Sequence, residues 1–111
     1  MADALGAAFA ALSDPTRRGV VDLLRRGPRR AGELAEVLDV SPPALSRHLR
    51  ILRESQLVEE VPHDEDGRVS VYRLKRAPFT RLRAFLDGVE ELWADQLTAF
   101  AEHVRKRKRP R

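Results

Sequence analysis

Two short helical segments separated by a turn of two residues constrain the fold of this chain more than any other feature. The segments are residues 31–38 and 41–55. Ser41 is a good N-cap and Pro42 suits the first position of a helix, so the second segment should begin as a helix directly after the turn. Two helices joined by so short a connection predict a helix-turn-helix over about residues 31–55.

A β-hairpin is expected directly after these helices. Residues 57–62 and 68–74 are β-type segments, and the stretch between them contains Asp66-Gly67, a hairpin turn signal. Such a hairpin is called a wing. Further helices are expected over residues 3–12, 15–26 and 78–108. The sequence therefore predicts a mainly α fold with a small β-hairpin, a winged helix-turn-helix of five helices.

We expect one domain over residues 1–104, with the wing at 57–74, the C-terminal helix at 78–104 and a basic tail at 105–111. The last helix carries a regular apolar stripe, made up of Leu82, Leu86, Val89, Trp93, Leu97, Phe100 and Val104. This stripe covers about six turns, on the order of 40 Å of helix. A domain of this size cannot cover such a stripe by itself.

The helix that begins at Ser41 divides into two faces. At 100° per residue, three leucines cluster within about 60° and should face the core: Leu45, Leu49 and Leu52. The residues that point away are Pro43, Ser46, Arg47 and Arg50, with Arg53 at the border. No acidic residue occurs between Asp39 and Glu54. Arginine can bond to guanine O6 and N7 in the major groove, and serine can bond to bases or phosphates.

An ordinary solvated face is the alternative interpretation of these arginines. The order of elements, a helix-turn-helix followed by a wing, favours DNA reading over it. The helix N-terminus at Ser41 favours a phosphate. His48 lies about 60° from the centre of the core face, so packing or phosphate contact is favoured over base reading. Arg68 and Arg73 on the wing could hold phosphates.

The charge of the whole chain does not argue for DNA binding. Six basic residues of the tail account for more than the entire net charge of +4. The wing tip, Asp64-Glu65-Asp66, is acidic and would be repelled by DNA, so it is either held clear or contacts something else. The case for DNA binding therefore rests on local charge.

Several classes of function are excluded or disfavoured. The chain has no cysteine, which excludes disulfides, thiolate metal sites and cysteine redox switches. No apolar run is long enough to span a membrane, and the start lacks the pattern of a signal peptide, so we expect the cytoplasm. No paired carboxylates, nucleophile–base pair or Gly-rich phosphate loop is visible. We therefore expect no enzyme and no cofactor.

Five motifs, in this order, resemble the ArsR/SmtB family of winged-helix repressors. They are Leu12-Ser-Asp-Pro-Thr-Arg-Arg18, Gly32-Glu-Leu-Ala-Glu36, Ser41-Pro-Pro-Ala-Leu-Ser-Arg-His-Leu49, Leu52-Arg-Glu-Ser-Gln-Leu-Val58 and Val71-Tyr-Arg-Leu74. The resemblance implies a homodimer built from the first and last helices. The expected interface residues are Leu5, Phe9, Leu86, Val89, Trp93, Leu97 and Phe100.

The resemblance also implies double-stranded DNA as the partner, at an operator with two-fold symmetry. Two recognition helices would sit in successive major grooves, about 34 Å apart. Family positions that approach bases match Pro42, Pro43, Ser46 and Arg47. The two prolines leave Ser46 and Arg47 as the expected readers.

The metal sensing known in that family is not expected here. Its thiolate site lies in the third helix, where this chain has Leu34-Ala-Glu-Val-Leu38, and its other site uses two histidines on the last helix, which here has only His103. A small-molecule effector could bind around Phe9, Trp93 and Phe100, but plain interface packing is favoured. The alternative function is a winged-helix protein-interaction module without sequence-specific DNA binding.

Overall fold

The computed structural model describes residues 3–108. In that range the elements are α1 (Ala4–Leu12), α2 (Pro15–Leu24), α3 (Ala31–Leu38), α4 (Pro42–Glu54), β1 (Val58–Pro62), β2 (Ser70–Leu74) and α5 (Arg76–Lys108). The predicted five helices and hairpin are confirmed. Residues 1–79 and 80–111 form two compact units, which are described separately.

Side-chain caps determine where α2 and α4 begin. The carboxylate of Asp14 accepts a hydrogen bond from the Arg17 amide at 3.0 Å, and the Ser41 hydroxyl accepts one from the Ala44 amide at 3.3 Å. Each cap satisfies one of the amides that a helix N-terminus leaves without a partner, and proline follows directly. Both N-termini therefore lie where the sequence predicts them.

The turn between α3 and α4 depends on Asp39. This residue adopts a left-handed conformation with φ of 53°, which ends α3 and reverses the chain. The Val40 amide then donates to the Ala35 carbonyl at 3.1 Å. Because aspartate tolerates this conformation better than most residues, α4 can begin three residues later, at Pro42. The predicted helix-turn-helix is confirmed.

The N-terminus of α2 lies where the sequence predicts it, but its C-terminus does not. The helix ends at Leu24 instead of near Arg26. Gly27 has φ of 145°, a conformation open mainly to glycine, and it turns the chain towards the wing. Arg29 then forms a bridge with Tyr72, donating to its carbonyl at 3.1 Å and accepting from its amide at 2.8 Å. The segment after α2 is thus held against the wing by a contact distant in sequence.

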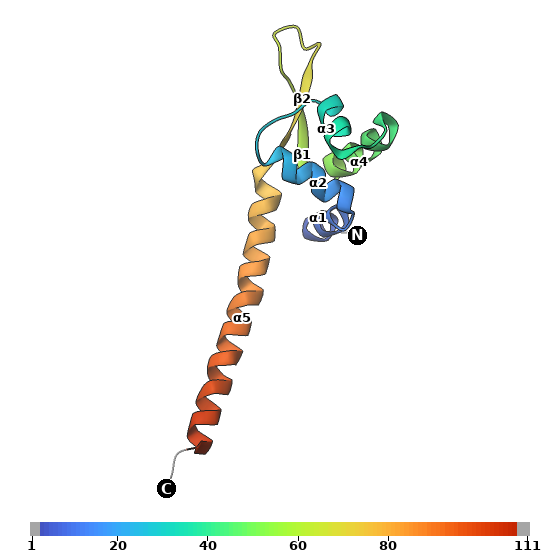
Figure 1. Cartoon of the computed structure of the whole chain (residues 1–111). Helices are drawn as coiled ribbons and strands as arrows, with labels where there is room; N and C mark the ends of the chain where they lie inside the picture. The colour runs from blue at the N-terminus through green and yellow to red at the C-terminus, as the bar shows by residue number, and fades with distance from the viewer. Residues whose placement is uncertain (1–2, 109–111) are drawn as a thin grey trace. The chain divides into compact units, whose positions relative to one another are not determined.

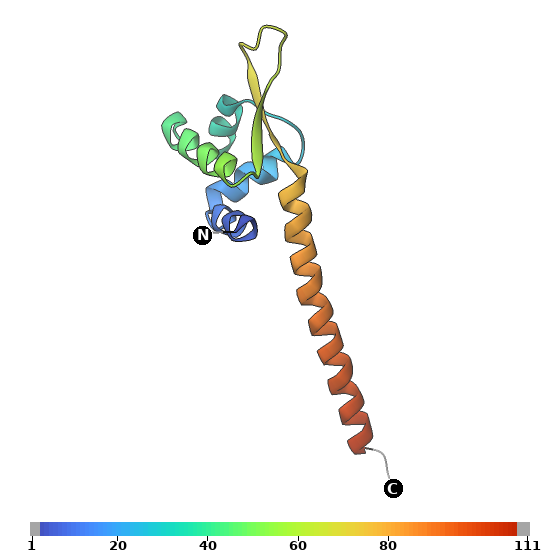
Figure 2. The same cartoon turned by 180° about the vertical axis from the view of Figure 1, so that it is seen from behind.

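The wing is an antiparallel pair in which Val58 lies opposite Leu74 and Pro62 lies opposite Ser70. Its loop contains Gly67 at φ of 69°, the left-handed position that the Asp-Gly signal predicts. The strands begin one or two residues later than predicted. In both views of the molecule the hairpin tip projects beyond the helices α1 to α4 (Figure 1, Figure 2).

Aliphatic side chains from α2, α3, α4 and the wing form the core of the first unit. The largest side chains with almost no exposed surface are Val20, Leu34, Leu45, Leu49, Leu52, Leu57 and Val58, and Ala8 and Ala11 of α1 are buried as well. The three leucines predicted to face inward from α4 are all among them. Their burial fixes which side of α4 remains at the surface, because side chains of a helix that face inward and outward alternate with its period of about 3.6 residues.

Residues 80–108 belong to α5, which begins at Arg76, two residues before the predicted start at Pro78. The stripe residues Leu86, Trp93, Leu97 and Phe100 are between 52% and 66% exposed in the single chain. No helix within residues 3–108 is both long and apolar enough to cross a membrane. The helix continues through Arg105 to Lys108, so part of the basic tail is helical, whereas residues 109–111 lie outside the described residues.

Candidate nucleic-acid interface

The outer face of α4 presents the polar set that the sequence predicts. Pro43, Ser46, Arg47 and Arg50 are exposed, on the side opposite the buried leucines. Ser46, Arg47, Arg50 and Arg53 together line a shallow depression of about 250 Å³. The structure thus gathers one hydroxyl and three guanidinium groups on one face of one helix. This set can donate hydrogen bonds to base edges and to phosphates.

The start of α4 adds to this electropositive face. Ser41, Pro42 and Pro43 are exposed there, and Ser41 caps the helix with its hydroxyl. The helix dipole favours an anion at this end. The backbone of the first turn offers no free donor, because Pro42 and Pro43 have no N–H and the Ala44 amide donates to Ser41. The expectation that Ser41 lies beside a phosphate stays a prediction.

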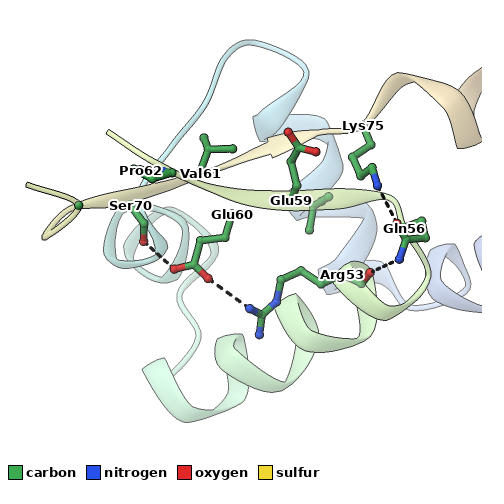
Figure 3. Close-up of a pocket in the computed structure, with 10 residues that line it drawn as sticks. Arg53, Gln56, Glu59, Glu60, Val61, Pro62, Ser70 and Lys75 are labelled. Carbon is green, nitrogen blue, oxygen red and sulfur yellow. Dashed lines mark hydrogen bonds and ion pairs between the residues drawn. The ribbon is translucent and has the colours of Figure 1, made fainter. Parts of the chain in front are cut away.

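Arg53 differs from the other arginines of α4 because a carboxylate of the wing holds it. Its Nη1 lies 3.2 Å from the Oε2 atom of Glu60 on β1. Glu60 also accepts hydrogen bonds from the Ser70 hydroxyl at 2.7 Å and the Tyr72 hydroxyl at 3.1 Å. We call Arg53, Glu60, Ser70 and Tyr72 the wing-base cluster. Figure 3 shows how three of its members join α4 to both strands.

The wing-base cluster shifts the acidity of two of its members. The hydrogen bond from Ser70 lowers the pKa of the Glu60 carboxyl, and the Tyr72 hydroxyl and the Arg53 charge act in the same direction. Burial raises the pKa of the Tyr72 hydroxyl, and the nearby Glu60 carboxylate adds to that rise. Glu60 is therefore ionised at neutral pH and holds Arg53 against the wing.

An open pocket of about 520 Å³ lies beside this cluster, between the end of α4 and the wing. Lys75 closes one side by donating to the Gln56 side chain at 2.6 Å (Figure 3). The side-chain Nε2 of Gln56 lies 3.5 Å from the Arg53 carbonyl. These contacts join the end of α4 to the base of the wing. They therefore hold the wing base in place relative to the exposed face of α4.

The two wing arginines have different surroundings. Arg73 forms an ion pair with Glu59 on the opposite strand, with 2.7 Å between Nη2 and Oε1. The Glu59 carboxylate therefore compensates the positive charge of Arg73, the residue that the sequence predicts to contact phosphate. Arg68 is exposed in the loop, as are Asp64, Glu65 and Asp66. The phosphate contacts predicted for Arg68 and Arg73 stay predictions.

His48 points back into the molecule and is half-buried. Its Nδ1 lies 3.3 Å from Nη1 of Arg17 on α2 and 3.8 Å from the Oδ1 atom of Asp14. The backbone amide of Arg17 lowers the pKa of the Asp14 carboxyl, and the charge of the Arg17 guanidinium lowers it further. This environment is the packing arrangement that the position of His48 on the helix suggests.

The sequence predicts no role for Arg17, Arg18 or Glu60. The Arg17 Nε donates to the Ala11 carbonyl at 2.7 Å, and the Arg18 Nη1 donates to the Leu12 carbonyl at 2.9 Å. Both arginines thus satisfy carbonyls that the end of α1 leaves open. A weak signal was available, because Arg17 and Arg18 directly follow the capping motif Asp14-Pro-Thr. No comparable signal marked Glu60, whose partners are distant in sequence.

The predicted interface residues lie on α1 and α5. Phe9 on α1 is 41% exposed and Leu5 is half-buried. On α5, Val89 is 37% exposed, the least of the five residues expected there.

Within the described part of the chain, no group of three or more His, Asp or Glu side chains could hold a metal ion. The absence of a metal site stays a prediction.

Fold and site together define a winged helix-turn-helix DNA-binding protein. A solved ArsR-like transcriptional regulator from Rhodococcus sp. RHA1 matches 93% of this chain and 92% of its own, with a TM-score of 0.76 and 33% identity. The homodimeric winged helix-turn-helix DNA-binding domain of Mb0332 from Mycobacterium bovis matches 85% of this chain and 84% of its own, with a TM-score of 0.62 and 24% identity. This second likeness concerns the fold alone.

Sequence relatives carry the identification further. The model of the family described as "Bacterial regulatory protein, arsR family" matches residues 14–60. The HTH-type transcriptional regulator Rv2034 of Mycobacterium tuberculosis (strain ATCC 25618 / H37Rv) is 41% identical over 87% of this chain and 85% of its own length. The transcriptional repressor SdpR of Bacillus subtilis (strain 168) is 44% identical over 47% of this chain and 58% of its own. The chain belongs to the ArsR family of transcriptional regulators.

Proposed function

We propose that this chain acts as a homodimeric repressor that binds an inverted-repeat operator, with one α4 helix reading each half-site. Ser46 and Arg47 contact bases, while Arg50 and the start of α4 at Ser41 contact phosphates. The single observation that carries this proposal is the exposed face of α4, where Ser46, Arg47, Arg50 and Arg53 share one depression. Hydrogen-bond donors on one helix face suit the acceptors that guanine and the DNA phosphates present.

Such a dimer represses transcription where its operator overlaps a promoter, because the bound protein then excludes other proteins from that DNA. The relative SdpR is itself named a repressor, and Mb0332 is named a homodimer. A dimer with two reading helices requires half-sites about one helical turn apart. A regulator of this kind works in the cytoplasm of a bacterium and has no enzymatic activity.

The decisive experiment is a selection of duplexes from random-sequence DNA with the full-length protein. We expect an enriched inverted repeat whose half-site centres lie about 10 base pairs apart or a multiple of that. Arg47→Ala should weaken binding to the enriched duplex by about 1–3 kcal/mol and relax base preference at one position per half-site. Fluorescence anisotropy at one fixed salt concentration measures both.

Arg83→Ala is the matched control, since it removes the same charge from α5, where Arg83 is 85% exposed and lies 3.8 Å from Asp87. The control should bind the enriched duplex like the natural protein. Equal losses for the two variants would mean that Arg47 contributes only net charge. Failure to enrich any sequence, together with salt-independent binding, would favour a protein-interaction module instead.

A further inference from the structure

Arg17 joins three helices of the first unit. Its Nε donates to the Ala11 carbonyl at 2.7 Å, and its Nη2 lies 3.5 Å from the Ala10 carbonyl, both in the last turn of α1. Its own backbone amide is fixed by the Asp14 cap of α2. The third contact leaves this pair of helices, because Nη1 lies 3.3 Å from Nδ1 of His48 on α4.

The position of His48 gives this contact its importance. His48 directly follows Arg47, the residue expected to read bases, and precedes the buried Leu49. A guanidinium is planar and its donors point in fixed directions. One group that bonds to α1 and to His48 at the same time therefore restricts how far α4 can turn about its axis or slide against α1 and α2.

We propose that Arg17 and His48 are positioning residues for DNA recognition: their contact sets the orientation in which α4 presents Ser46 and Arg47. This inference rests on the proposed function, because it assumes that α4 reads the DNA. Neither side chain needs to touch DNA in this role. Arg17 also links α4 to α1, one of the two helices expected to form the dimer, so the geometry of each reading helix is tied to the dimer interface.

Arg18 distinguishes positioning from simple support of α1. It lies next to Arg17 and donates to the Leu12 carbonyl at 2.9 Å, so it stabilises the same end of α1. Among residues 3–108, no hydrogen bond given by Arg18 reaches α4. Arg18→Lys and Arg17→Lys are therefore matched substitutions. Both substitutions keep the positive charge. Only Arg17→Lys removes a guanidinium that contacts both α1 and α4.

The test uses a duplex enriched by the natural protein from random-sequence DNA, together with an unrelated duplex of the same length. Arg17→Lys should weaken binding to the enriched duplex about tenfold, since a charge-assisted hydrogen bond is lost. Binding to the unrelated duplex should change less than about twofold, because backbone attraction depends on charge and the charge is kept. Arg18→Lys should leave both affinities within about twofold.

Substitutions at His48 test the same contact from the other side and do not disturb α1. The Oδ1 atom of asparagine can accept a hydrogen bond near the place of the imidazole Nδ1. His48→Asn should therefore keep the affinity for the enriched duplex within about threefold, whereas His48→Leu should lose about tenfold. The double variant Arg17→Lys with His48→Leu should lose no more than either single variant, as residues that act through one contact are not additive.

Different outcomes overturn different statements. If the natural protein enriches no sequence, the proposed function fails before any variant is compared. If a sequence is enriched but Arg17→Lys binds it as tightly as Arg18→Lys does, the positioning role is wrong. It is also wrong if Arg17→Lys weakens binding to both duplexes alike, which would indicate a phosphate contact, or if losses from Arg17 and His48 add. Circular dichroism confirms that each variant is folded.

Discussion

Individual arginines on this surface differ by the groups that face them. Arg47 and Arg50 lie on the exposed face of α4, whereas Glu60 holds Arg53 and Glu59 holds Arg73. A guanidinium already paired with a carboxylate must exchange that partner to meet a phosphate, so it contributes less to binding than its formal charge suggests. The number of arginines in the sequence therefore overstates the electropositive surface offered to DNA.

Asp14 leads to a prediction about pH. Asp14→Ala should lower the free energy of unfolding by about 1 kcal/mol at pH 7, because the N-cap of α2 is lost. The pKa of this carboxyl is lowered in the folded state, so its contribution is complete above its unfolded value. The contribution should decline as the pH falls below about 4–5 and approach zero only below the folded-state pKa. Urea unfolding at a series of pH values measures the difference.

Asp14→Asn is the control for this prediction, because an amide caps the helix but does not titrate in this range. The difference between the asparagine and alanine variants should stay constant with pH. A difference between the natural protein and Asp14→Ala that is as large at pH 3 as at pH 7 would contradict the assignment of the carboxylate as the cap.

At the scale of elements, backbone conformation separates two glycine positions, Gly27 and Gly32. Gly27→Ala should destabilise the protein by more than about 1 kcal/mol, since Gly27 has φ of 145° at the end of α2. Gly32→Ala should stabilise it by about 0.4–1 kcal/mol, because a Cβ at this site in α3 meets nothing within 4 Å. Thermal unfolding followed by circular dichroism should show shifts of opposite sign, and shifts of equal sign would contradict this explanation.

The wing as an element carries more negative than positive charge near its tip. Glu65→Gln with Asp66→Asn should raise the affinity for any duplex at low salt, because two repulsive charges disappear. Asp64 is left unchanged, since its side chain accepts a hydrogen bond from the Val69 amide at 3.3 Å. Anisotropy titrations at several salt concentrations provide the measurement. An unchanged affinity would show that the tip is held clear of DNA.

At the scale of the whole molecule, the apolar stripe of α5 predicts self-association. Leu97 is 63% exposed in the single chain, and placing a carboxylate there should prevent a second copy from covering the stripe. Leu97→Glu is therefore expected to sediment as a monomer in analytical ultracentrifugation and to bind the inverted repeat at least tenfold more weakly, because two half-sites are no longer engaged together.

Asp95→Glu serves as the comparison, since it leaves the charge of the same helix unchanged away from the stripe. It should remain a dimer at concentrations where Leu97→Glu is monomeric. A dimer that survives Leu97→Glu would place the interface elsewhere. The single tryptophan, Trp93, offers a second signal, since its emission should move to longer wavelength when dilution exposes it.

Sequence by itself determined the identity and order of the elements and the face that α4 buries. These features depend on neighbours a few residues apart: the caps at Asp14 and Ser41, the leucines of α4 and the Asp-Gly turn of the wing. Local conformational preference and helical periodicity act within one element and can be recognised without a tertiary structure. The exposed face of α4, which we propose meets DNA, belongs to this part, because it is the side opposite the buried leucines.

Only the tertiary structure decided which side chains meet across elements. Glu60 pairs with Arg53 near the end of α4, Arg29 forms a bridge with Tyr72, and Arg17 contacts His48. Each of these contacts joins residues of different elements through directional hydrogen bonds. Such bonds form only when the packing of the buried leucines has set the distances between the elements. Those distances cannot be predicted from the spacing of residues in the sequence.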